Sequence, residues 1–420
     1  MKVLLLGSGG REHALAVGLR ADPDVAEIHV APGNAGIADD VDEVHHLDPT
    51  DAPAVVALAR RVDADLVVVG PEAPLVAGVA DTVREAGIPC FGPSADAARI
   101  EGSKAYAKQV MAAAGVPTAM AHVCDTPQEV AAALDAFGPP FVVKDDGLAA
   151  GKGVVVTDDR EAAMAHAVAC GRVLVEEYLD GPEVSLFCVT DGRTVRPLLP
   201  AQDFKRIFDD DEGPNTGGMG AYTPLPWAPA TLVDDIVERV VQPTVDEMRG
   251  SGTPFAGLLY AGLALTARGL RVVEFNARFG DPETQAVLAL QRTPLGSLLH
   301  SAAVGTLHAT EPPHWRDGAA VTVVMAAAGY PGSPRTGDVI TGLDAVAGLE
   351  GVRVLHAGTA RRGADVVTAG GRVLSVTATG LDLRHARRRA YDAVARIDFD
   401  GAQYRTDIAA RAAAEAEATG

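Results

Sequence analysis

The sequence predicts an α/β protein of several domains, whose first domain is a doubly wound parallel sheet. In the first hundred residues, short apolar runs alternate with helical stretches, which is the pattern of parallel strands joined by helices. Two later regions, 120–185 and 186–300, are rich in strand patterns and carry fewer helices, as in α+β units. A length of 420 residues with 48% hydrophobic residues allows two to four domains.

The predicted first domain covers residues 1–100. We expect strands at 2–7, 27–31 and 65–72, and helices at 11–21, 52–61 and 76–86. Ligands of a doubly wound sheet bind at the carboxyl ends of its strands. The turns at those ends are rich in Gly, Pro or Asn, so they are candidates for a binding site; they are 7–11, 32–36 and 70–75.

A connector and three further domains are expected after residue 100. The expected units are a connector at 101–118, a small α+β domain at 119–185, a central α+β domain at 186–312 and a C-terminal α+β domain at 313–420. The small domain reads strand, helix, hairpin, helix, strand. Other helices are expected near 231–249, 283–304 and 383–397, and the alanine-rich end at 409–418 is expected to fray.

Composition and charge exclude several classes of protein. A net charge of −20 disfavours nucleic-acid binding, and the basic "ARRRA" at 386–390 is better explained as a solvated helix face. No apolar run approaches the roughly 20 residues of a membrane helix, and the start has no signal-peptide pattern. The four cysteines are scattered and the eleven histidines show no H-x-x-x-H spacing, so neither a disulfide framework nor a histidine metal cluster is expected. We therefore expect a cytoplasmic protein with no membrane or nucleic-acid partner.

The stretch "VVKDDGLAAGKGVVV", 142–156, has the composition of a phosphate-binding loop. A P-loop needs four residues between its glycines and a Ser or Thr after the lysine. Here Gly147 and Gly151 are separated by three residues, and Lys152 is followed by Gly153. Because β-branched runs flank the glycines on both sides, the stretch predicts a hairpin with a glycine loop.

The stretch "RVVEFNARFGDPE", 271–283, predicts a metal-binding strand. Alternate residues of a strand share a face, so Glu274, Asn276 and Arg278 line up while their neighbours point into a core. A carboxylate and an amide oxygen on one face suit Mg²⁺, and an arginine beside them suits phosphoryl transfer. The alternative is a solvated strand face with an ion pair.

Two further stretches suggest nucleotide contacts. The strand "VLVEEYLDGPE", 173–183, ends in acidic residues, where exposed backbone groups can read an adenine edge and Glu183 can accept ribose hydroxyls. An ordinary strand-to-turn exit would look similar. In "RIEGSKAYAK", 99–108, Lys104 begins a helix and is a candidate phosphate contact, although any single lysine is more often a surface residue.

The N-terminal "GSGGREH" follows a strand and opens a helix. The dinucleotide fingerprint needs a third glycine where this chain has Glu12, so we favour a phosphomonoester, bound at the helix N-terminus beside Arg11, over NAD. Another glycine-rich loop, "DDEGPNTGGMGAYTP" at 210–224, is irregular and is predicted to be functional. Asp203 and Lys205 precede it and can bind a small zwitterion. A plain surface excursion is the alternative for this loop.

Taken in order, these motifs resemble the phosphoribosylamine–glycine ligases, a family of the ATP-grasp superfamily. The resemblance runs nearly end to end through "GSGGREHALA", "APGNAGIA", "VVGPEAPLVAGVAD", "IEGSKAYAK", "DGLAAGKGV", "PNTGGMGAY", "EFNARFGDPETQ" and "GGRVLSVTA". It implies an ATP-grasp fold in which the small domain is a lid that closes over ATP. It also implies glycine, 5-phosphoribosylamine and ATP as substrates, Mg²⁺ or Mn²⁺ as cofactor, and a monomer.

The same resemblance implies roles for individual residues. Nucleotide contacts are implied for Lys104, Lys144, Gly151, Lys152, Gly153, Glu176, Glu177, Leu179 and Glu183. Substrate contacts are implied for Gly9, Gly10, Arg11, Asn34, Glu72, Asp203, Lys205, Gly218, Met219, Gly220 and Arg278. Metal ligation falls to Glu274 and Asn276, and catalysis to Lys144 and Arg278.

The chain departs from the family pattern at two places. Asp145 stands where the family usually has alanine, and the segment between Ala163 and Val173 is shorter than usual. The alternative functions are another carboxylate–amine ligase or a biotin-dependent carboxylase subunit, a nicotinamide-dependent oxidoreductase, and a nucleotide sensor without turnover. The N-terminal motif counts against the other ligases and carboxylases, and Glu12 counts against the oxidoreductase. The intact strand at 271–283 counts against the sensor.

Overall fold

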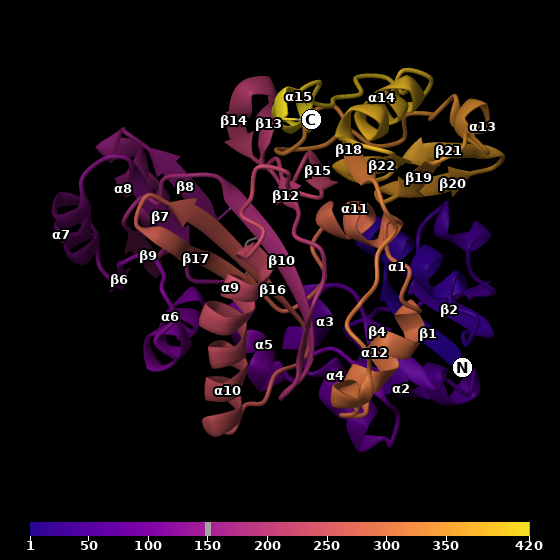
Figure 1. Cartoon of the computed structure of the whole chain (residues 1–420), viewed down its shortest axis with the longest axis horizontal. Helices are drawn as coiled ribbons and strands as arrows, with labels where there is room; N and C mark the ends of the chain where they lie inside the picture. The colour runs from indigo at the N-terminus through magenta and orange to yellow at the C-terminus, as the bar shows by residue number, and fades with distance from the viewer. Residues whose placement is uncertain (148–152, 420) are drawn as a thin grey trace.

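The computed structural model describes residues 1–147 and 153–419, with the side chains of 416–419 left aside. Within these residues the strands form four larger sheets and two two-stranded ribbons. Figure 1 shows the N-terminal and C-terminal domains on one side and the small domain projecting on the other. No helix of the described residues is both long enough and apolar enough to cross a bilayer.

The N-terminal domain is a parallel sheet with strand order β3-β2-β1-β4-β5, as predicted. Its elements are β1 (Lys2–Gly7), α1 (Gly10–Arg20), β2 (Glu27–Pro32), β3 (Glu43–Val44), α2 (Ala52–Arg61), β4 (Leu66–Val69), α3 (Glu72–Val76), α4 (Val79–Glu85) and β5 (Cys90–Phe91), with a short 3-10 turn η1 (Ile37–Asp39). β1 and β4 are buried on both faces, which explains their uninterrupted apolar runs. The helix expected at 76–86 is α4, which begins only after Gly78 at φ +80°, and residues 72–76, expected as a strand end and turn, form the helix α3.

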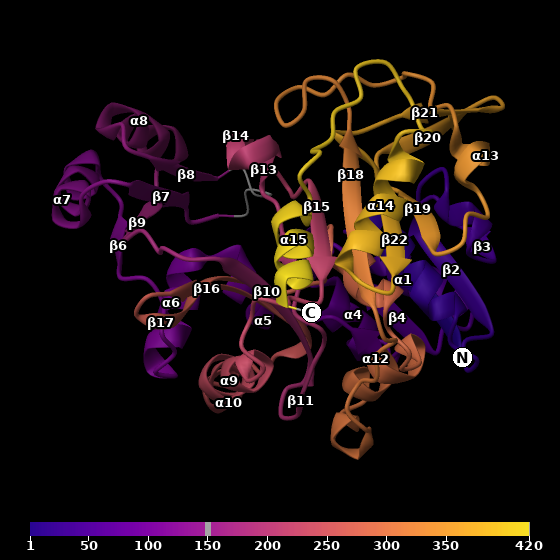
Figure 2. The same ribbon diagram turned by 45° about the horizontal axis from the view of Figure 1, so that its top comes forward.

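The small domain has the predicted order of elements and follows two connecting helices. The connector is α5 (Ala95–Gly102) and α6 (Lys104–Ala113). The small domain contains β6 (Ala121–Cys124), α7 (Pro127–Phe137), β7 (Phe141–Asp145), β8 (Val154–Thr157), α8 (Arg160–Cys170) and β9 (Val173–Glu176). Its sheet is antiparallel with order β6-β9-β7-β8, and α7 and α8 pack together against it over a separate apolar core (Figure 2). The last strand ends at Glu176, so only the first part of the stretch 173–183 is strand.

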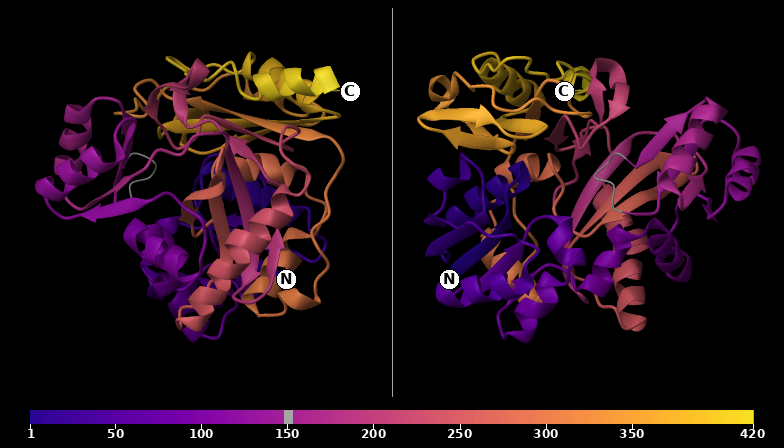
Figure 3. Two further views of the ribbon diagram at one scale, coloured as in Figure 1. Left: turned by 60° about the vertical axis from the view of Figure 1, so that its left-hand side comes forward. Right: turned by 180° about the vertical axis from the view of Figure 1, so that it is seen from behind.

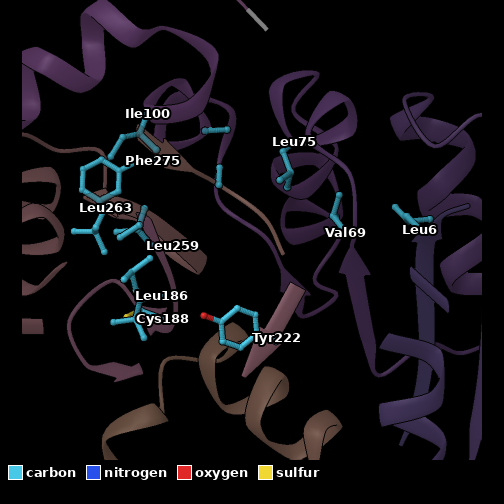
Figure 4. Packing of buried hydrophobic residues seen from close by; sticks show 14 of the residues in the cluster. Leu6, Val69, Leu75, Ile100, Leu186, Cys188, Tyr222, Leu259, Leu263 and Phe275 are labelled. Atoms are coloured by element: carbon cyan, nitrogen blue, oxygen red, sulfur yellow. The ribbon is translucent and has the colours of Figure 1, made fainter. Parts of the chain in front are cut away.

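The central domain is built on an antiparallel sheet with order β11-β10-β16-β17. Its elements are β10 (Glu183–Asp191), β11 (Val195–Pro197), α9 (Leu232–Ile236), the π-helical turn η3 (Val237–Val241), α10 (Gln242–Gly250), β16 (Ala256–Thr266), β17 (Gly269–Asn276), α11 (Glu283–Ala289), α12 (Leu295–Ala303) and the 3-10 turn η4 (Leu307–Ala309). The helix expected at 283–304 is two helices, with Pro294 immediately before the second. The apolar core of this domain is continuous with that of the N-terminal domain, from Leu6 and Val69 to Leu259 and Phe275 (Figure 4).

The C-terminal domain shares its sheet with a segment that precedes it in the sequence. Its sheet order is β12-β15-β18-β22-β19, and β12 (Gln202–Asp203) and β15 (Gly220–Thr223) precede the proposed boundary at 313. That boundary therefore separates strands of one sheet. The other elements are β18 (Ala319–Ala326), α13 (Leu343–Val346), β19 (Val352–His356), the ribbon β20 (Thr359–Arg362) with β21 (Asp365–Thr368), β22 (Arg372–Gly380), α14 (Leu383–Val394) and α15 (Ala410–Thr419).

Two peripheral features complete the fold. The ribbon of β13 (Arg206–Phe208) and β14 (Glu212–Asn215), with the 3-10 turn η2 (Asp209–Asp211) between them, lies beside α15. The alanine-rich end that was expected to fray is the helix α15, which packs against α14 and buries Ala412. Figure 3 shows from two sides that the small domain projects away from the terminal domains.

Candidate active site

A cavity of about 1280 Å³ lies where the small domain, the central sheet and the two terminal domains meet. Most residues that the sequence nominated for ligand binding line this cavity. They are Arg11, Glu72, Lys104, Lys144, Gly153, Glu176, Glu177, Leu179, Glu183, Asp203, Lys205, Glu274, Asn276 and Arg278. Because these residues are distant in sequence, the arrangement of the domains creates the site.

The glycine-rich segment forms a hairpin, as predicted. β7 and β8 pair antiparallel, and the Asp145 amide donates to the Gly153 carbonyl at 2.7 Å beneath the loop. The Asp145 carboxylate accepts a hydrogen bond from the Gly147 amide at 3.1 Å, which stabilises the turn leading into the loop. Gly151 and Lys152 lie outside the described residues, so their nucleotide contacts stay predictions.

Lys144 on β7 is held by a carboxylate from the neighbouring strand. Its ammonium group lies 2.8 Å from Glu176 and donates to the Val273 carbonyl at 3.1 Å. Glu176 also pairs with Lys108 at 3.0 Å. Lys144 and Glu176 are 5% and 3% exposed, so this is a buried triad of two cations and one anion. A dry triad with surplus positive charge is suited to receive a polyphosphate.

Lys104 and Lys108 project from the same side of α6 toward the cavity. Lys104 donates to the Gly147 carbonyl at 3.1 Å, at the start of the glycine loop. Burial lowers the pKa of Lys108, and Glu176 offsets only part of this effect. Sequence reasoning missed Lys108, although its i,i+4 spacing from Lys104 was a usable signal. We call Lys104, Lys108 and Lys144 the lysine end of the cavity.

The acidic residues after β9 are engaged in different ways. The Glu177 carboxylate accepts from the Met120 amide at 3.0 Å and from Arg268 at 2.8 Å, so its side chain braces β6 and β16–β17. Glu183 pairs with Lys205 at 2.5 Å. Among the described residues, the Leu179 backbone amide has no hydrogen-bond partner, although Leu179 lines the cavity. A free backbone amide there is consistent with the predicted recognition of an adenine edge.

The strand β17 carries the predicted metal ligands with the predicted alternation. Phe275 and Ala277 are buried in the core, while Glu274 and Asn276 line the cavity. The Asn276 amide oxygen accepts a long hydrogen bond from Arg278 at 3.4 Å. The Glu274 carboxylate forms no hydrogen bond or ion pair with any residue that the structure describes. An unpaired carboxylate beside an amide oxygen is a donor set that fits Mg²⁺.

The field around Glu274 is strongly positive. Burial by itself would raise the pKa of this carboxyl, but the surrounding cations hold it below its usual range. These cations are Lys205, Lys144, Lys104 and Arg278. A polyanion with a metal ion would be stabilised here, because the positive charges are already oriented toward one point.

Arg278 is held by two carboxylates from the connector and the N-terminal domain. Its guanidinium lies 3.2 Å from Glu72 and 3.0 Å from Glu101, and Glu101 also accepts from the Ala277 amide at 2.7 Å. Although burial lowers it, the pKa of Arg278 is raised overall by Glu101 and Glu72. Sequence reasoning missed Glu101, because nothing in residues 99–108 shows that this carboxylate faces β17.

A second carboxylate cluster lies beside Lys205. Glu283 is 3% exposed and accepts from Tyr260 at 2.5 Å and from Ser185 at 3.1 Å. Asp203 makes no side-chain hydrogen bond within the described part of the chain. Burial raises the pKa of Asp203 to about 8; Lys205 opposes this rise, and Glu283 and other carboxylates add to it. Without a ligand this carboxyl is mostly protonated at neutral pH, and a substrate ammonium group beside it would favour the ionised form.

The glycine turn before α1 does not leave the helix N-terminus open to a ligand. The Gly9 amide donates to the Glu12 carboxylate at 2.5 Å, and the Arg11 amide donates to Asp281 at 3.3 Å. A side chain at Gly10 would meet the Gln285 amide nitrogen at 2.8 Å. Of the predicted trio, only Arg11 lines the cavity, because protein carboxylates take the place that a phosphate was expected to fill.

Two other groups of predicted substrate residues also lie outside the cavity lining. Asn34 donates to the carbonyls of Ser8 and His356 at 2.9 and 2.8 Å, and thereby ties the N-terminal domain to β19. Met219 is fully buried. Its neighbours Gly218 and Gly220 pack closely against other residues of the protein. These residues shape the walls around the site, and their substrate contacts stay predictions.

One histidine cluster was not expected from the spacing of the histidines. His29, Glu43 and His45 come together across β2 and β3, with 3.1 Å between His29 Nδ1 and His45 Nε2. Arg61 lies 3.5 Å from His45 Nδ1. Since arginine only donates, this arrangement puts the His45 proton on Nε2, where it bonds His29. The cluster is therefore explained as a hydrogen-bonded pair and not as a metal site.

Three family models match consecutive parts of the chain. They are the phosphoribosylglycinamide synthetase N domain over residues 1–101, the ATP-grasp (A) domain over 102–284 and the C domain over 320–411. The chain belongs to the phosphoribosylglycinamide synthetase family. Among curated relatives of this family, the phosphoribosylamine–glycine ligase of Streptomyces coelicolor is 70% identical over 98% of this chain and 100% of its own length. The Mycobacterium bovis ligase is 61% identical over 98% and 99%.

Solved structures agree with this family assignment. The phosphoribosylamine–glycine ligase of Thermotoga maritima superposes with a TM-score of 0.84 and 34% identity, covering 97% of this chain and 100% of that one. The biotin carboxylase domain of a 2-oxoglutarate carboxylase from Hydrogenobacter thermophilus, described with MgADP and bicarbonate, gives a TM-score of 0.72 at 18% identity over 96% and 91%. The second likeness shows the ATP-grasp fold alone. The predicted ATP-grasp fold is therefore confirmed, and the oxidoreductase alternative is wrong.

Within this synthetase, the residues that sequence reasoning missed share one property. Lys108, Glu101, Glu283, Asp281 and Arg372 all line the cavity and pair with groups remote in sequence. Arg372, for example, lies 3.4 Å from Asp281, 91 residues away. We call Arg11, Arg278 and Arg372 the arginine end of the cavity.

Proposed function

We propose that the chain is an ATP-dependent ligase that joins glycine to 5-phosphoribosylamine. The products are glycinamide ribonucleotide, ADP and phosphate, in a step of de novo purine biosynthesis. The curated relatives carry the name of this ligase. The observation that carries the proposal is the unpaired Glu274 carboxylate, which four cationic side chains surround. This arrangement suits a metal-bound triphosphate better than any neutral ligand.

The nucleotide is proposed to lie between the β7–β8 hairpin and β17. The lysine end faces its phosphates, with Lys144 and the Gly153 backbone on one side and Lys104 on the other. The chain after β9 frames the adenine, and Glu183 accepts the ribose hydroxyls once Lys205 turns toward substrate. The free Leu179 amide supports this placement.

Glu274 and Asn276 are the residues that would hold Mg²⁺, or Mn²⁺ in its place. The bound ion would neutralise charge on the phosphates. The neighbouring side chains place further positive charge at the same point. Because these charges are fixed before ATP arrives, little reorganisation is needed during transfer.

The first chemical step forms glycyl phosphate. A carboxylate oxygen of glycine attacks the γ-phosphorus, and the bond from that phosphorus to ADP breaks. Asp203 is proposed to receive the glycine ammonium group, and Arg278 to neutralise the transferring phosphoryl group. Lys205 would meet the glycine carboxylate. Alignment and charge neutralisation account for most of the rate in a step of this kind.

The second step forms the amide. The amine nitrogen of phosphoribosylamine attacks the carbonyl carbon of glycyl phosphate, and the carbon–oxygen bond to phosphate breaks. The amine proton leaves with the phosphate. Water must be excluded during this interval, which is the use of a closing lid. The amine substrate is proposed to enter from the arginine end, where Glu72 and Arg11 line the wall.

Three further properties are part of the proposal. We infer a monomer that works alone on small molecules. The four cysteines are unpaired in the structure, which fits a reducing compartment, and we place the reaction in the cytoplasm. Nothing in this mechanism needs a nucleic-acid or membrane partner.

The decisive experiment is a coupled assay of ADP release. We expect release only when glycine and phosphoribosylamine are both present. Equal release with D-alanine or bicarbonate in place of glycine would overturn the assignment. Glu274→Gln should lower turnover by about 1000-fold or more, because it removes the charge that fixes the metal. Glu27→Gln, on the N-terminal sheet, is the matched control and should leave turnover unchanged.

A further inference from the structure

The arginine end of the cavity contains one guanidinium that the mechanism above does not use. Arg278 is saturated by Glu72 and Glu101. Arg11 and Arg372 line the same region, from α1 and from the first residue of β22. The family resemblance assigned no role to Arg372, and β22 belongs to the C-terminal domain.

Arg372 is anchored through only one of its three nitrogen atoms. Its Nη1 donates to the carbonyls of Gly217 and Asp281, both at 2.6 Å, and lies 3.4 Å from the Asp281 carboxylate. Within the described residues, its Nε and Nη2 have no hydrogen-bond partner. These two atoms form one edge of the planar guanidinium, the edge that binds carboxylate or phosphate in a bidentate manner. The side chain is 21% exposed, so this edge is accessible to a ligand.

The anchoring also fixes the plane of that edge. A side chain at Gly217 would meet the guanidinium carbon at 3.0 Å and its Nη2 at 3.2 Å, so the glycine backbone lies flat against it. The loop around Gly217 is held in turn by the Tyr330 hydroxyl, which accepts from the Gly217 amide at 2.9 Å. A donor edge held this firmly loses little conformational entropy when it binds an anion.

Arg11 supplies a second unsatisfied donor nearby. It is 9% exposed, and its Nε is buried without a hydrogen-bond partner in the described structure. Arg11 and Arg372 lie beside the same carboxylate, since the Arg11 amide contacts one oxygen of Asp281 and Arg372 contacts the other. The Arg11 backbone and the Arg372 guanidinium therefore meet at Asp281, and both side chains line the same cavity, with Arg11 Nη1 3.5 Å from Glu12.

We propose that Arg372, together with Arg11, binds the 5-phosphate of phosphoribosylamine. The proposal rests on the proposed function and names the group that recognises this substrate's phosphate. Since carboxylates occupy the N-terminus of α1, side chains must supply the positive charge. A phosphomonoester is a near-dianion at neutral pH with three acceptor oxygens, which matches two guanidinium groups. Through Arg372 the C-terminal domain becomes part of the substrate site.

Ribose 5-phosphate and ribose test this assignment as inhibitors against phosphoribosylamine. They share the sugar and differ in the phosphate, so their ratio of inhibition constants reports phosphate recognition alone. The wild-type protein should prefer ribose 5-phosphate. Arg372→Met should weaken ribose 5-phosphate by about 10- to 100-fold and leave ribose within twofold, as expected for one lost charge-assisted bidentate contact. Arg372→Lys should recover part of the loss, because it keeps the charge without the fork.

Controls separate a binding role from a structural one. Arg361→Met, an exposed arginine of the same domain, should leave both constants unchanged. The KM values for ATP and glycine should stay within twofold in all three variants. If Arg372→Met weakened ribose and its phosphate equally, the residue would be only a structural anchor, and the proposal would be overturned. It would also be overturned if the Lys variant, folded by thermal melting, kept the full phosphate preference of wild type.

The proposed function fails by a different observation. If wild-type protein released no ADP that depended on glycine and phosphoribosylamine, the ligase reaction itself would be wrong. A protein that is active, but whose Arg372 variants keep the full preference for ribose 5-phosphate, would contradict only the inference about phosphate recognition.

Discussion

The two ends of the cavity carry the same sign of charge but are built differently. The lysine end is assembled from adjacent elements, with Lys144 and Lys108 sharing Glu176 and Lys104 touching the start of the glycine loop. The arginine end joins elements up to 270 residues apart, as in the contact between Arg11 and Asp281. Lysine is a compact point charge, whereas arginine offers a planar fork that several partners can hold. The nucleotide side therefore depends mainly on the small domain and the connector packed beside it, and the substrate side depends on the docking of the N-terminal, central and C-terminal domains.

Of the changes that compare the two ends, Lys144→Met has the largest expected effect. It removes a buried cation from the lysine end and leaves Glu176 paired with Lys108 alone. We expect kcat/KM for ATP to fall by about 100- to 1000-fold, as when one preorganised charge is lost from a transition state. Steady-state kinetics with varied ATP checks this, with Lys2→Met, a half-buried lysine outside the cavity, as the control. An unchanged constant would mean that the lysine end is only structural.

Glu101→Gln examines the docking at the arginine end. Glutamine can still accept a hydrogen bond from the Ala277 amide. The change therefore mainly removes the negative charge of residue 101 that pairs with Arg278. We expect the free energy of unfolding to fall by about 1–3 kcal/mol, because a buried ion pair loses one partner while Glu72 remains. The kcat/KM for phosphoribosylamine should fall by about tenfold. Urea unfolding and kinetics measure these effects, and a loss confined to ATP would contradict the division between the two ends.

Asp203→Asn is expected to change how the free energy of unfolding depends on pH. The pKa of Asp203 is raised to about 8 from its usual value near 4, so the folded protein holds a proton there that the unfolded chain releases. The contribution of Asp203 to the free energy of unfolding therefore decreases as pH rises from about 4 to about 8. We expect wild type to lose about 3–4 kcal/mol relative to the Asn variant between pH 5 and pH 8. Unfolding without substrates at both pH values tests the sign; an equal response of both proteins would exclude it.

Asp145→Ala is expected to have the smallest effect. It restores the residue that the family usually has and removes a hydrogen bond to the Gly147 amide. The lost negative charge should favour ATP and the lost turn should disfavour it, so KM for ATP should change by about threefold or less. A tenfold change in either direction would show that this carboxylate controls the loop. Fluorescence titration with an ATP analogue provides an independent reading.

Much of the local structure could be predicted from short-range patterns. The hairpin at 142–156 followed from β-branched residues on both sides of glycines, and the face of β17 followed from strict alternation. The break between α11 and α12 was missed, and the helix after Gly78 begins later than expected, because the ends of helices leave weaker patterns than their interiors. The pairing of β12 and β15 with the C-terminal sheet was missed, because strand pairing over a hundred residues leaves no local pattern.

The cavity residues also fall into two groups, those that could be predicted from their own segment and those that could not. Lys144, Glu274 and Asn276 were nominated correctly as cavity residues, because the chemistry of each is visible within its own strand. Glu101 and Arg372 were not nominated, because a carboxylate or guanidinium becomes informative only when its partner is known. Gly9 and Gly10 were expected to contact substrate, but they do not line the cavity. Glu12 and Asp281, whose positions the local sequence did not reveal, satisfy the amides of that turn.

The order of amino acids alone was enough to predict most helices and strands, the glycine hairpin at 142–156 and the oxygen ligands on β17. These features depend on patterns that extend over only a few neighbouring residues. Which charges meet, and which donors stay free at the arginine end, depended on how the domains pack. Ion pairs and hydrogen bonds require distances of about 3 Å in space, and the packing of four domains sets those distances.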